Sequence, residues 1–307
     1  MRSRSWARHR AEHLLFRAVS GTLGLLPEGS AAAFGSIAGR LSLQVARSRK
    51  RILLENLAAA FPERSENERR RIAQECIDRF GATFMEFLES SALSRAEVEE
   101  RVTVEGVEHL QAARQRGKGV FLLSAHFGSW EIGAVRAGLL GEPISSVVRP
   151  LDNPLLEEEL ARRRTRFGNR LIQKKDAARE VLRAIRAGQT VAILIDQNVL
   201  AEEAIFVPFF GRLAATTPSL ALFQMKTDAA VVPVFTWPIG GGRYRLVFET
   251  PILASEFESA PDRSERVRQA TARYTAAAER AIREYPAAWL WMHNRWRTRP
   301  EGEAVSS

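Results

Sequence analysis

A buried strand that leads directly into a helix is predicted for residues 120–131, Val120-Phe-Leu-Leu-Ser-Ala-His126-Phe-Gly-Ser-Trp-Glu131. Residues 120–125 form a short apolar run, which is typical of a strand covered on both faces. Gly128 lets the chain turn, and Ser129 can cap the following helix, so that Glu131 falls in its first turn. His126 is therefore expected at the junction between strand and helix.

Further strand-like and helical segments alternate around this stretch. Apolar, β-branched or aromatic runs predict strands over residues 120–125, 144–148, 191–195, 231–237 and 244–249. Helices are expected over residues 131–140, 154–167, 176–187 and 218–227. This alternation predicts an α/β fold in which helices cover both faces of a mostly parallel sheet.

The N-terminal part of the chain is predicted to be helical. Between residues 69 and 88, apolar residues recur at spacings of three and four, which places them on one helix face. We divide the chain into an N-terminal helical, membrane-associating region (residues 1–95), an α/β core (residues 96–300) and a disordered tail (residues 301–307).

Two apolar stretches, residues 14–26 and 31–45, stand beside a group of basic residues near the N-terminus: Arg2, Arg4, Arg8 and Arg10. Arg17 interrupts the first stretch and Arg40 the second, and both are shorter than the roughly 20 apolar residues that span a bilayer. We interpret them as two helices that lie on a membrane face, with the basic residues near anionic head groups. The alternative is a helical pair packed on the body of the protein.

The charge balance indicates an anionic partner. Lys and Arg number 45 against 36 Asp and Glu, which gives a formal net charge of +9. Such a charge suits an anionic membrane surface, a phosphorylated substrate or carrier, or nucleic acid. The single cysteine, Cys76, rules out an intrachain disulfide and a cysteine-based zinc site, and its place on an apolar helix face indicates a core residue.

Polar side chains follow three of the predicted strands. His126 follows residues 120–125, Arg149 follows residues 144–148, and Asp196 follows residues 191–195. Because ligands bind beyond the carboxyl ends of the strands in an open α/β sheet, we expect Arg149 and Asp196 close to His126 at one edge. Gln197 and Ser129 are further candidates for binding substrate.

His126 and Glu131 form the candidate catalytic pair. The N-terminus of a helix favours the ionised form of a carboxylate in its first turn. Ionised Glu131 can orient the imidazole and stabilise it once protonated, so that His126 can act as general base on a hydroxyl. The alternative is a structural histidine at a strand end and a glutamate that serves only the helix.

The segment from His126 to Glu131 resembles the His-x-x-x-x-Asp/Glu motif of the glycerolipid and lipid A acyltransferases. It has the Glu-bearing form of the bacterial lipid A (Kdo-dependent lauroyl/myristoyl) branch, which also includes the phosphatidylinositol mannoside acyltransferases. Other segments are similar to further blocks of the family, in the same order along nearly the whole chain: residues 56–63, 148–154, 196–198, 206–211, 216–217 and 291–300. The N-terminus departs from the pattern, because many members carry an uninterrupted membrane-spanning helix.

This resemblance implies transfer of a fatty acyl group from a thioester of acyl carrier protein or coenzyme A to a hydroxyl of a membrane glycolipid. It implies His126 as general base and Glu131 as its partner, with Arg149 and Asp196 on other polar positions of the family. No metal, cofactor or covalent acyl-enzyme is expected. A lipid A precursor is the expected acceptor, with phosphatidylinositol mannoside or another glycolipid or aminolipid as alternatives. The expected location is the cytoplasmic face of the inner membrane, with peripheral or monotopic attachment.

A thioester already has a good leaving group, so the catalyst needs a base and donors for the oxyanion. Arg149, or backbone N–H groups near Ser129, could supply these donors. The alternative for Arg149 is a salt bridge to Glu131 or Asp196 that only shapes the site. An aromatic group is either a wall for the acyl chain or ordinary core: Phe206, Phe209 and Phe210. Basic residues between Arg162 and Lys175 could grip an acidic carrier or a lipid phosphate.

A basic nucleic-acid-binding or other non-enzymatic anion-binding protein is the main alternative from another class. The basic residues are spread over many predicted helices, and no helix-turn-helix, zinc-finger or ribonucleoprotein signature is present. A serine hydrolase would need a Gly-x-Ser-x-Gly elbow and a Rossmann dehydrogenase a Gly-x-Gly-x-x-Gly turn, and the sequence has neither. We therefore expect an acyltransferase without a nucleic-acid partner.

Overall fold

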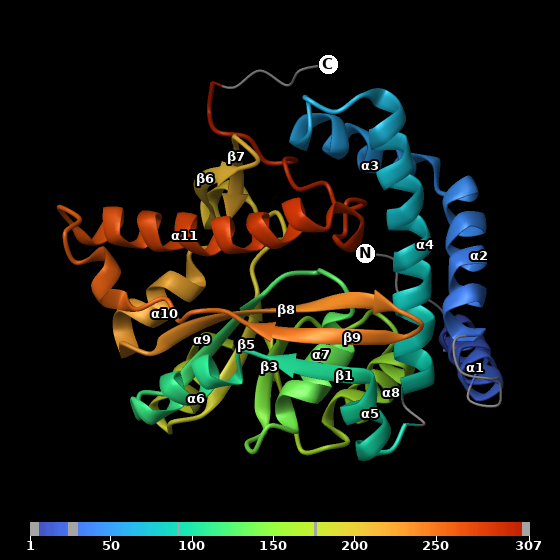
Figure 1. The fold of residues 1–307 in the computed structure, drawn as a ribbon, viewed down its shortest axis with the longest axis horizontal. Helices are drawn as coiled ribbons and strands as arrows, with labels where there is room; N and C mark the ends of the chain where they lie inside the picture. The colour runs from blue at the N-terminus through green and yellow to red at the C-terminus, as the bar shows by residue number, and fades with distance from the viewer. Residues whose placement is uncertain (1–5, 24–29, 91–92, 175–176, 303–307) are drawn as a thin grey trace.

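The computed structural model describes residues 6–23, 30–90, 93–174 and 177–302 (Figure 1). Arg2, Arg4 and most of the tail predicted to be disordered (residues 303–307) lie outside the described residues. Seven strands form one sheet in the order β1-β9-β8-β2-β5-β3-β4. Their bounds are β1 (Val102–Glu105), β2 (Val120–Ser124), β3 (Ile144–Val148), β4 (Arg170–Gln173), β5 (Thr190–Leu194), β8 (Ala230–Gly240) and β9 (Arg243–Phe248). A separate antiparallel ribbon consists of β6 (Ile205–Phe209) and β7 (Arg212–Thr216).

Every neighbouring pair in the large sheet is parallel except β8 and β9, which form an antiparallel hairpin. β2 lies at the centre of the sheet, where Leu122 stands opposite Ala192 of β5 and Val232 of β8. The predicted mostly parallel sheet is confirmed, and so are the five predicted strands. The strands that the sequence did not indicate are the short edge strands β1 and β4 and the ribbon β6–β7.

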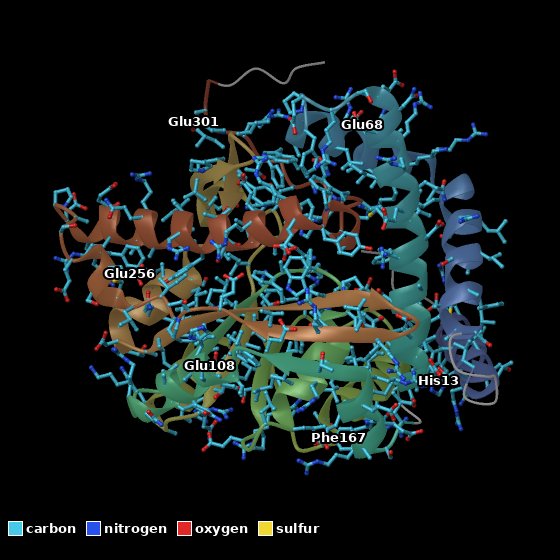
Figure 2. All side chains as sticks on the ribbon, viewed as in Figure 1. His13, Glu68, Glu108, Phe167, Glu256 and Glu301 are labelled. Atoms are coloured by element: carbon cyan, nitrogen blue, oxygen red, sulfur yellow. The ribbon has the colours of Figure 1, made fainter. Side chains whose placement is uncertain are left out.

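Helices pack on both faces of this sheet. On one face, Val120 and Leu122 contact α5 (Arg95–Arg101), α6 (Val107–Gln115) and α7 (Trp130–Gly138) in one apolar cluster. On the other face, Phe121 and Leu123 share a cluster with α9 (Ala177–Arg186), α10 (Ser219–Thr227) and α11 (Arg263–Glu284). Successive side chains of a strand point to opposite faces, so a continuous apolar run such as β2 needs both layers. Side chains fill the space between α11 and the sheet (Figure 2).

The remaining helices lie at the N-terminal end of the chain and beside α7. They are α1 (Trp6–Leu23), α2 (Ser30–Val45), α3 (Arg47–Ala60), α4 (Glu66–Ser90) and α8 (Pro154–Thr165). Short 3-10 turns occur at η2 (Ala201–Glu203), η3 (Ala254–Phe257) and η4 (Pro286–Ala288). The long helix α4 runs past the end of the sheet, and α2 lies along its outer side (Figure 1).

Close backbone contact joins α2 to α4. A Cβ atom added to Gly35 would come within 2.3 Å of the carbonyl oxygen of Gly81, so a larger residue does not fit there unless the backbone shifts. Arg40 of α2 also forms a two-bonded fork with Asp78 of α4, with both N–O distances at 2.6 Å. α1 is held differently, because the buried Arg163 of α8 donates to Ser20 (3.1 Å) and to the carbonyl of Leu88 (2.7 Å). Within the described residues, no helix combines the length and hydropathy needed to cross a bilayer.

Candidate active site

His126 lies at the carboxyl end of the central strand, in the tight turn that leads into α7. Gly128 takes a φ of +55° there, and a Cβ atom at this position would stand 1.7 Å from the backbone oxygen of Thr236. Only glycine combines this φ with so close an approach. The C-terminal segment also holds the turn, since Gly128 N–H donates to Ala288 (2.8 Å) and Leu290 N–H donates to the carbonyl of His126 (3.2 Å).

The imidazole of His126 is oriented by Asp196, which follows β5, the neighbouring strand. Nδ1 of His126 is 2.9 Å from one carboxylate oxygen of Asp196. The other oxygen accepts hydrogen bonds from the backbone N–H of His126 (3.0 Å) and from the indole N–H of Trp289 (2.7 Å). An ionised carboxylate only accepts, so Nδ1 of the neutral ring carries the proton and Nε2 keeps its lone pair. The expected proximity of Asp196 to His126 is confirmed.

Burial and charge have opposite effects on the pKa of each member of this pair. Burial disfavours the protonated imidazole, but the adjacent Asp196 carboxylate outweighs burial and raises the pKa of His126. Burial by itself would raise the pKa of Asp196, but the imidazole and the N–H donors lower it to about 2. Asp196 is therefore ionised at neutral pH and favours proton uptake at His126. Gln197 lies on the open side of the ring, with its amide nitrogen 3.3 Å from Nε2.

Glu131 does not orient the imidazole, contrary to our expectation. It sits in the first turn of α7 as predicted, but its carboxylate forms a fork with Arg164 of α8, with N–O distances of 2.5 and 2.9 Å. The reason is packing, because α8 lies beside α7 and brings a guanidinium within reach, while Asp196 already occupies Nδ1. The charge of Glu131 still contributes to the raised pKa of His126.

Ser129 stands at the N-cap of α7 as predicted, but its side chain does not cap the helix. Its ψ of 67° differs from that of an extended capping residue, and its side chain makes no hydrogen bond to the helix start. The hydroxyl is instead buried, beside the phenol of Tyr244. Ser129 begins the helix only through its carbonyl, which accepts from Gly133 N–H at 3.0 Å.

Arg149 lies at the same edge of the sheet as His126 but apart from it. Strand β5 separates β3 from β2, and two strand spacings amount to roughly 10 Å. The side chain is exposed, and among the described residues no hydrogen bond or ion pair joins Arg149 to His126, Glu131 or Asp196. The expected edge is thus confirmed, whereas the expected proximity of Arg149 to His126 and the alternative salt bridge to Glu131 or Asp196 are wrong.

Two of the three aromatic residues proposed as a wall for the acyl chain are core residues. Phe209 and Phe210 are buried, and Phe209 packs against Trp289 with ring centroids 5.4 Å apart. Phe206 is half-buried in the ribbon. None of the three lines the cavity next to His126.

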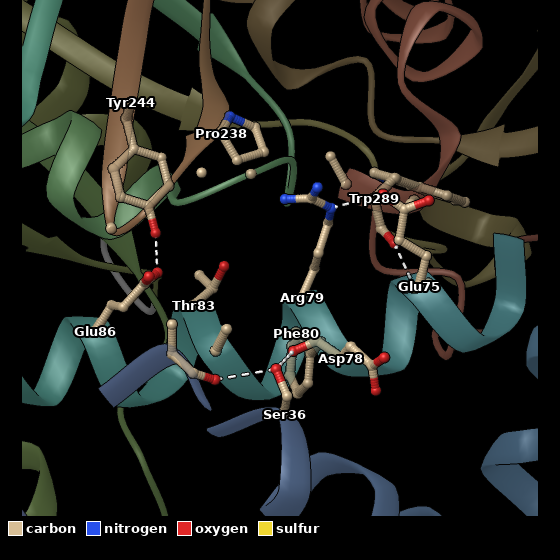
Figure 3. A pocket seen from close by; sticks show the side chains of 18 of the residues that line it. Ser36, Glu75, Asp78, Arg79, Phe80, Thr83, Glu86, Pro238, Tyr244 and Trp289 are labelled. Carbon is tan, nitrogen blue, oxygen red and sulfur yellow. Dashed lines mark hydrogen bonds and ion pairs between the residues drawn. The ribbon is translucent and has the colours of Figure 1, made fainter. Parts of the chain in front are cut away.

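That cavity lies between α4 and the β8–β9 hairpin and has a volume of about 260 Å³. His126, Trp130 and Trp289 line it on the side of the sheet. α4 supplies many polar groups on the other side, and Figure 3 shows the side chain of Arg79 rising from this helix between Trp289 and Tyr244. The cavity therefore reaches His126 and has a mixed lining, in which the polar side chains of α4 stand among alanines, glycines and the rings of Phe80, Trp130 and Trp289.

Several site residues escaped the sequence analysis. Arg164 stood out there only as part of a basic run, because its partner on α7 is far away in sequence. Trp289 lies just before the C-terminal segment 291–300, and no sequence motif indicated a functional role for it. Arg295, within that block, is buried, donates to the carbonyl of Ala215 and to Thr216, and has its pKa lowered by burial to about 10.

The amino-acid sequence of the chain matches a known protein family. The model of one family, described as bacterial lipid A biosynthesis acyltransferase, matches residues 5–298. The chain belongs to this family. The match includes the turn with His126 and Glu131, the segment after β5 with Asp196, and the C-terminal segment with Trp289. As a member, the protein is an acyltransferase.

Curated relatives of similar length agree with this assignment. The chain is 29% identical over 268 residues to the lipid A biosynthesis lauroyltransferase of Escherichia coli (strain K12), which covers 86% of this chain and 84% of that protein. It is 28% identical over 273 residues to the lipid A biosynthesis myristoyltransferase of the same organism, covering 89% and 81%. The lipid A biosynthesis palmitoleoyltransferase of that organism is also 28% identical, over 272 residues.

Proposed function

We propose that this acyltransferase moves a fatty acyl group from a carrier thioester to a hydroxyl of a lipid A precursor, with His126 as general base. The observation that carries the proposal is the orientation of His126. Asp196 holds Nδ1 at 2.9 Å, and His126 lines the cavity in a chain that belongs to the lipid A acyltransferase family. Phosphatidylinositol mannoside or another glycolipid or aminolipid is the alternative acceptor.

The proposed reaction needs one proton carrier. The acceptor hydroxyl attacks the thioester carbonyl while Nε2 of His126 takes its proton, and Asp196 stabilises the imidazolium that forms. The tetrahedral intermediate then expels the thiolate, which recovers the proton from Nε2. The products are the acylated lipid and the free thiol of the carrier, which is either acyl carrier protein or coenzyme A. Neither a metal, a cofactor nor a covalent acyl-enzyme is required.

Glu131 and Arg164 receive a positioning role in this proposal. Both side chains are less than about a quarter exposed, at 17% and 20%, and their fork joins the first turn of α7 to α8. A bidentate pair of this kind fixes the relative position of two elements more closely than a single bond. Glu131 therefore holds the turn that carries His126, and its charge adds to that of Asp196.

A direct test of the function is the mass of the acceptor after reaction. Purified protein is incubated with an acyl-carrier-protein or coenzyme A thioester and a lipid A precursor in detergent micelles. The expected result is a mass increase equal to one acyl group together with release of one free thiol. Acylation of phosphatidylinositol mannoside, with no change in the lipid A precursor, would favour the alternative acceptor.

We also propose that α2 faces the membrane. Its inner side packs on α4 through glycines, whereas its outer side carries exposed apolar side chains: Phe34 (49% exposed), Ile37 (58%) and Leu41 (58%). Their spacing of three and four places them on one face. A soluble protein would leave this row in water, whereas a bilayer interface would bury it.

Replacing Phe34, Ile37 and Leu41 together by serine is expected to weaken binding to anionic phospholipid vesicles roughly tenfold or more, because each buried apolar side chain contributes about 1.5–3 kcal/mol. Vesicle co-sedimentation measures this change. The matched control is Leu222→Ser on α10, at the opposite end of the sheet (Figure 1). High salt should weaken only the attraction between basic side chains and the anionic head groups. Equal binding of the triple variant and the wild type would refute the membrane face.

A further inference from the structure

A buried pair of polar side chains in the cavity has no part in the proposed chemistry. Tyr244 of β9 donates a hydrogen bond from its phenol to the carboxylate of Glu86 on α4. Both side chains line the cavity and are largely buried, with exposed fractions of 2% for Tyr244 and 9% for Glu86. Figure 3 places this pair on the side of the cavity away from Trp289. Arg79 lies between the pair and Trp289.

The surroundings of the pair are polar as well. The hydroxyls of Thr83 and Ser129 lie beside the Tyr244 phenol. Burial raises the pKa of Glu86 despite the hydrogen bond from Tyr244, and burial also raises the pKa of Tyr244. Arg79 is fixed by Glu75 (3.0 Å) and by the ring of Tyr285 (4.6 Å), and its guanidinium points into the same space.

An acyl chain is a poor occupant for the part of the cavity that Glu86 and Tyr244 line. A buried carboxyl and phenol need hydrogen-bond partners, and an alkyl chain would remove water from them without supplying any. A hydroxyl-rich head group supplies both donors and acceptors, so it can replace that water without loss. The polar groups at this end of the cavity therefore favour the head group of the acceptor over the acyl chain of the donor.

We propose that this cavity is the subsite for the hydroxyl-bearing head group of the acceptor glycolipid, with Glu86 and Tyr244 as its specificity-determining residues. The inference rests on the proposed function and assigns the acyl chain of the donor to a position away from Glu86 and Tyr244. Sugar hydroxyls bond to Glu86 and Tyr244, and Arg79 offers N–H groups from α4. The acceptor hydroxyl is thereby held toward Nε2 of His126. Phe80 of α4 and Ser36 on the inner side of α2 also line the cavity.

The test uses two conservative variants, Tyr244→Phe and Glu86→Gln. Each keeps the shape of the side chain and removes one hydrogen-bonding or charged group. With a lipid A precursor in detergent micelles as varied substrate and saturating thioester, KM for the acceptor should rise roughly tenfold in each variant, since a buried polar partner is lost. KM for the thioester and the chain length preferred should stay unchanged. Thermal melting confirms that the variants are folded.

Two matched controls lack any contact with the cavity. Tyr274→Phe removes an equally buried phenol, which donates to Gln224 on the other face of the sheet. Glu89→Gln alters a buried carboxylate on the same helix as Glu86, paired with Arg101 at 3.2 Å. Both should lose stability but keep KM for the acceptor.

Equilibrium binding of the same lipid A precursor in micelles gives a readout that does not depend on turnover. Weaker binding by Tyr244→Phe and Glu86→Gln than by the two controls supports the subsite even if no acyl transfer is detected, in which case the proposed reaction alone fails. A wild-type enzyme that acylates the precursor, with variants that change donor chain length or donor KM and leave acceptor binding intact, would overturn the inference. The cavity would then hold the acyl chain.

Discussion

Replacing His126 by alanine is expected to lower the rate of acyl transfer by about two to four orders of magnitude, which is the usual contribution of a general base. The fold should survive, because the loss of one side chain leaves the turn fixed by Gly128 and by the hydrogen bonds from the C-terminal segment. A thioester assay that follows thiol release in the presence of acceptor measures the rate.

His109→Ala is the matched control, since His109 is a half-buried histidine of α6 outside the cavity. It should retain wild-type activity. Binding of the acceptor to His126→Ala should be nearly unchanged, because the imidazole acts on a proton of the substrate and supplies little of its binding. Wild-type turnover by folded His126→Ala protein would exclude His126 as the base.

Asp196→Asn is expected to lower the rate of acyl transfer nearly as much as His126→Ala does. The loss should reach up to roughly four orders of magnitude, by analogy with the loss of the carboxylate from a catalytic triad. The amide has the same shape, but it removes the charge that stabilises the imidazolium. Its NH₂ group can also face Nδ1 and favour the tautomer that carries its proton on Nε2. The effect should fall on kcat and leave KM largely intact.

The control for this change is Asp228→Asn. Asp228 is a carboxylate near the start of β8 that pairs with Lys118 and Arg116 outside the cavity. Its replacement should leave kcat unaltered. If Asp196→Asn kept full activity, the imidazole would not depend on the carboxylate that the structure places on it.

The sequence predicted the edge of the sheet at which the site lies, because that inference needs only strand ends. His126 and Asp196 each follow a buried apolar run, and parallel strands end at one edge. The partner of the imidazole was predicted wrongly because it depends on strand order. β5 lies next to β2, so Asp196 reaches Nδ1, whereas the choice of Glu131 relied on nearness along the chain.

Strand order also explains the outcome for Arg149. Sequence alone gave no means to see that β5 is inserted between β2 and β3. The partner of Glu131 could not be predicted either, since Arg164 comes from a helix that only tertiary packing brings to α7. Periodicity did identify the helices that pack there.

The cavity is the part of the site that sequence patterns predict least well. Its walls include α4 and the β8–β9 hairpin, and strands β1 to β7 lie between these two elements in the sequence. Glu86 falls in a helix whose apolar stripe was evident, but the pattern does not show that Tyr244 opposes it across a hollow. Pairs of this kind form only in the folded protein, and local sequence propensity does not predict them.

The pH dependence of kcat/KM for the acceptor, measured in the wild type and in Asp196→Asn, tests most directly whether His126 is a base governed by Asp196. A base must be neutral, so activity should rise with pH through the pKa of His126. Because Asp196 raises that pKa, the rise in the wild type should be centred above the ordinary value of 6.5. Removal of the negative charge should move the centre to lower pH in the residual activity of Asp196→Asn. A rise that stays at the same pH in both proteins would contradict the account.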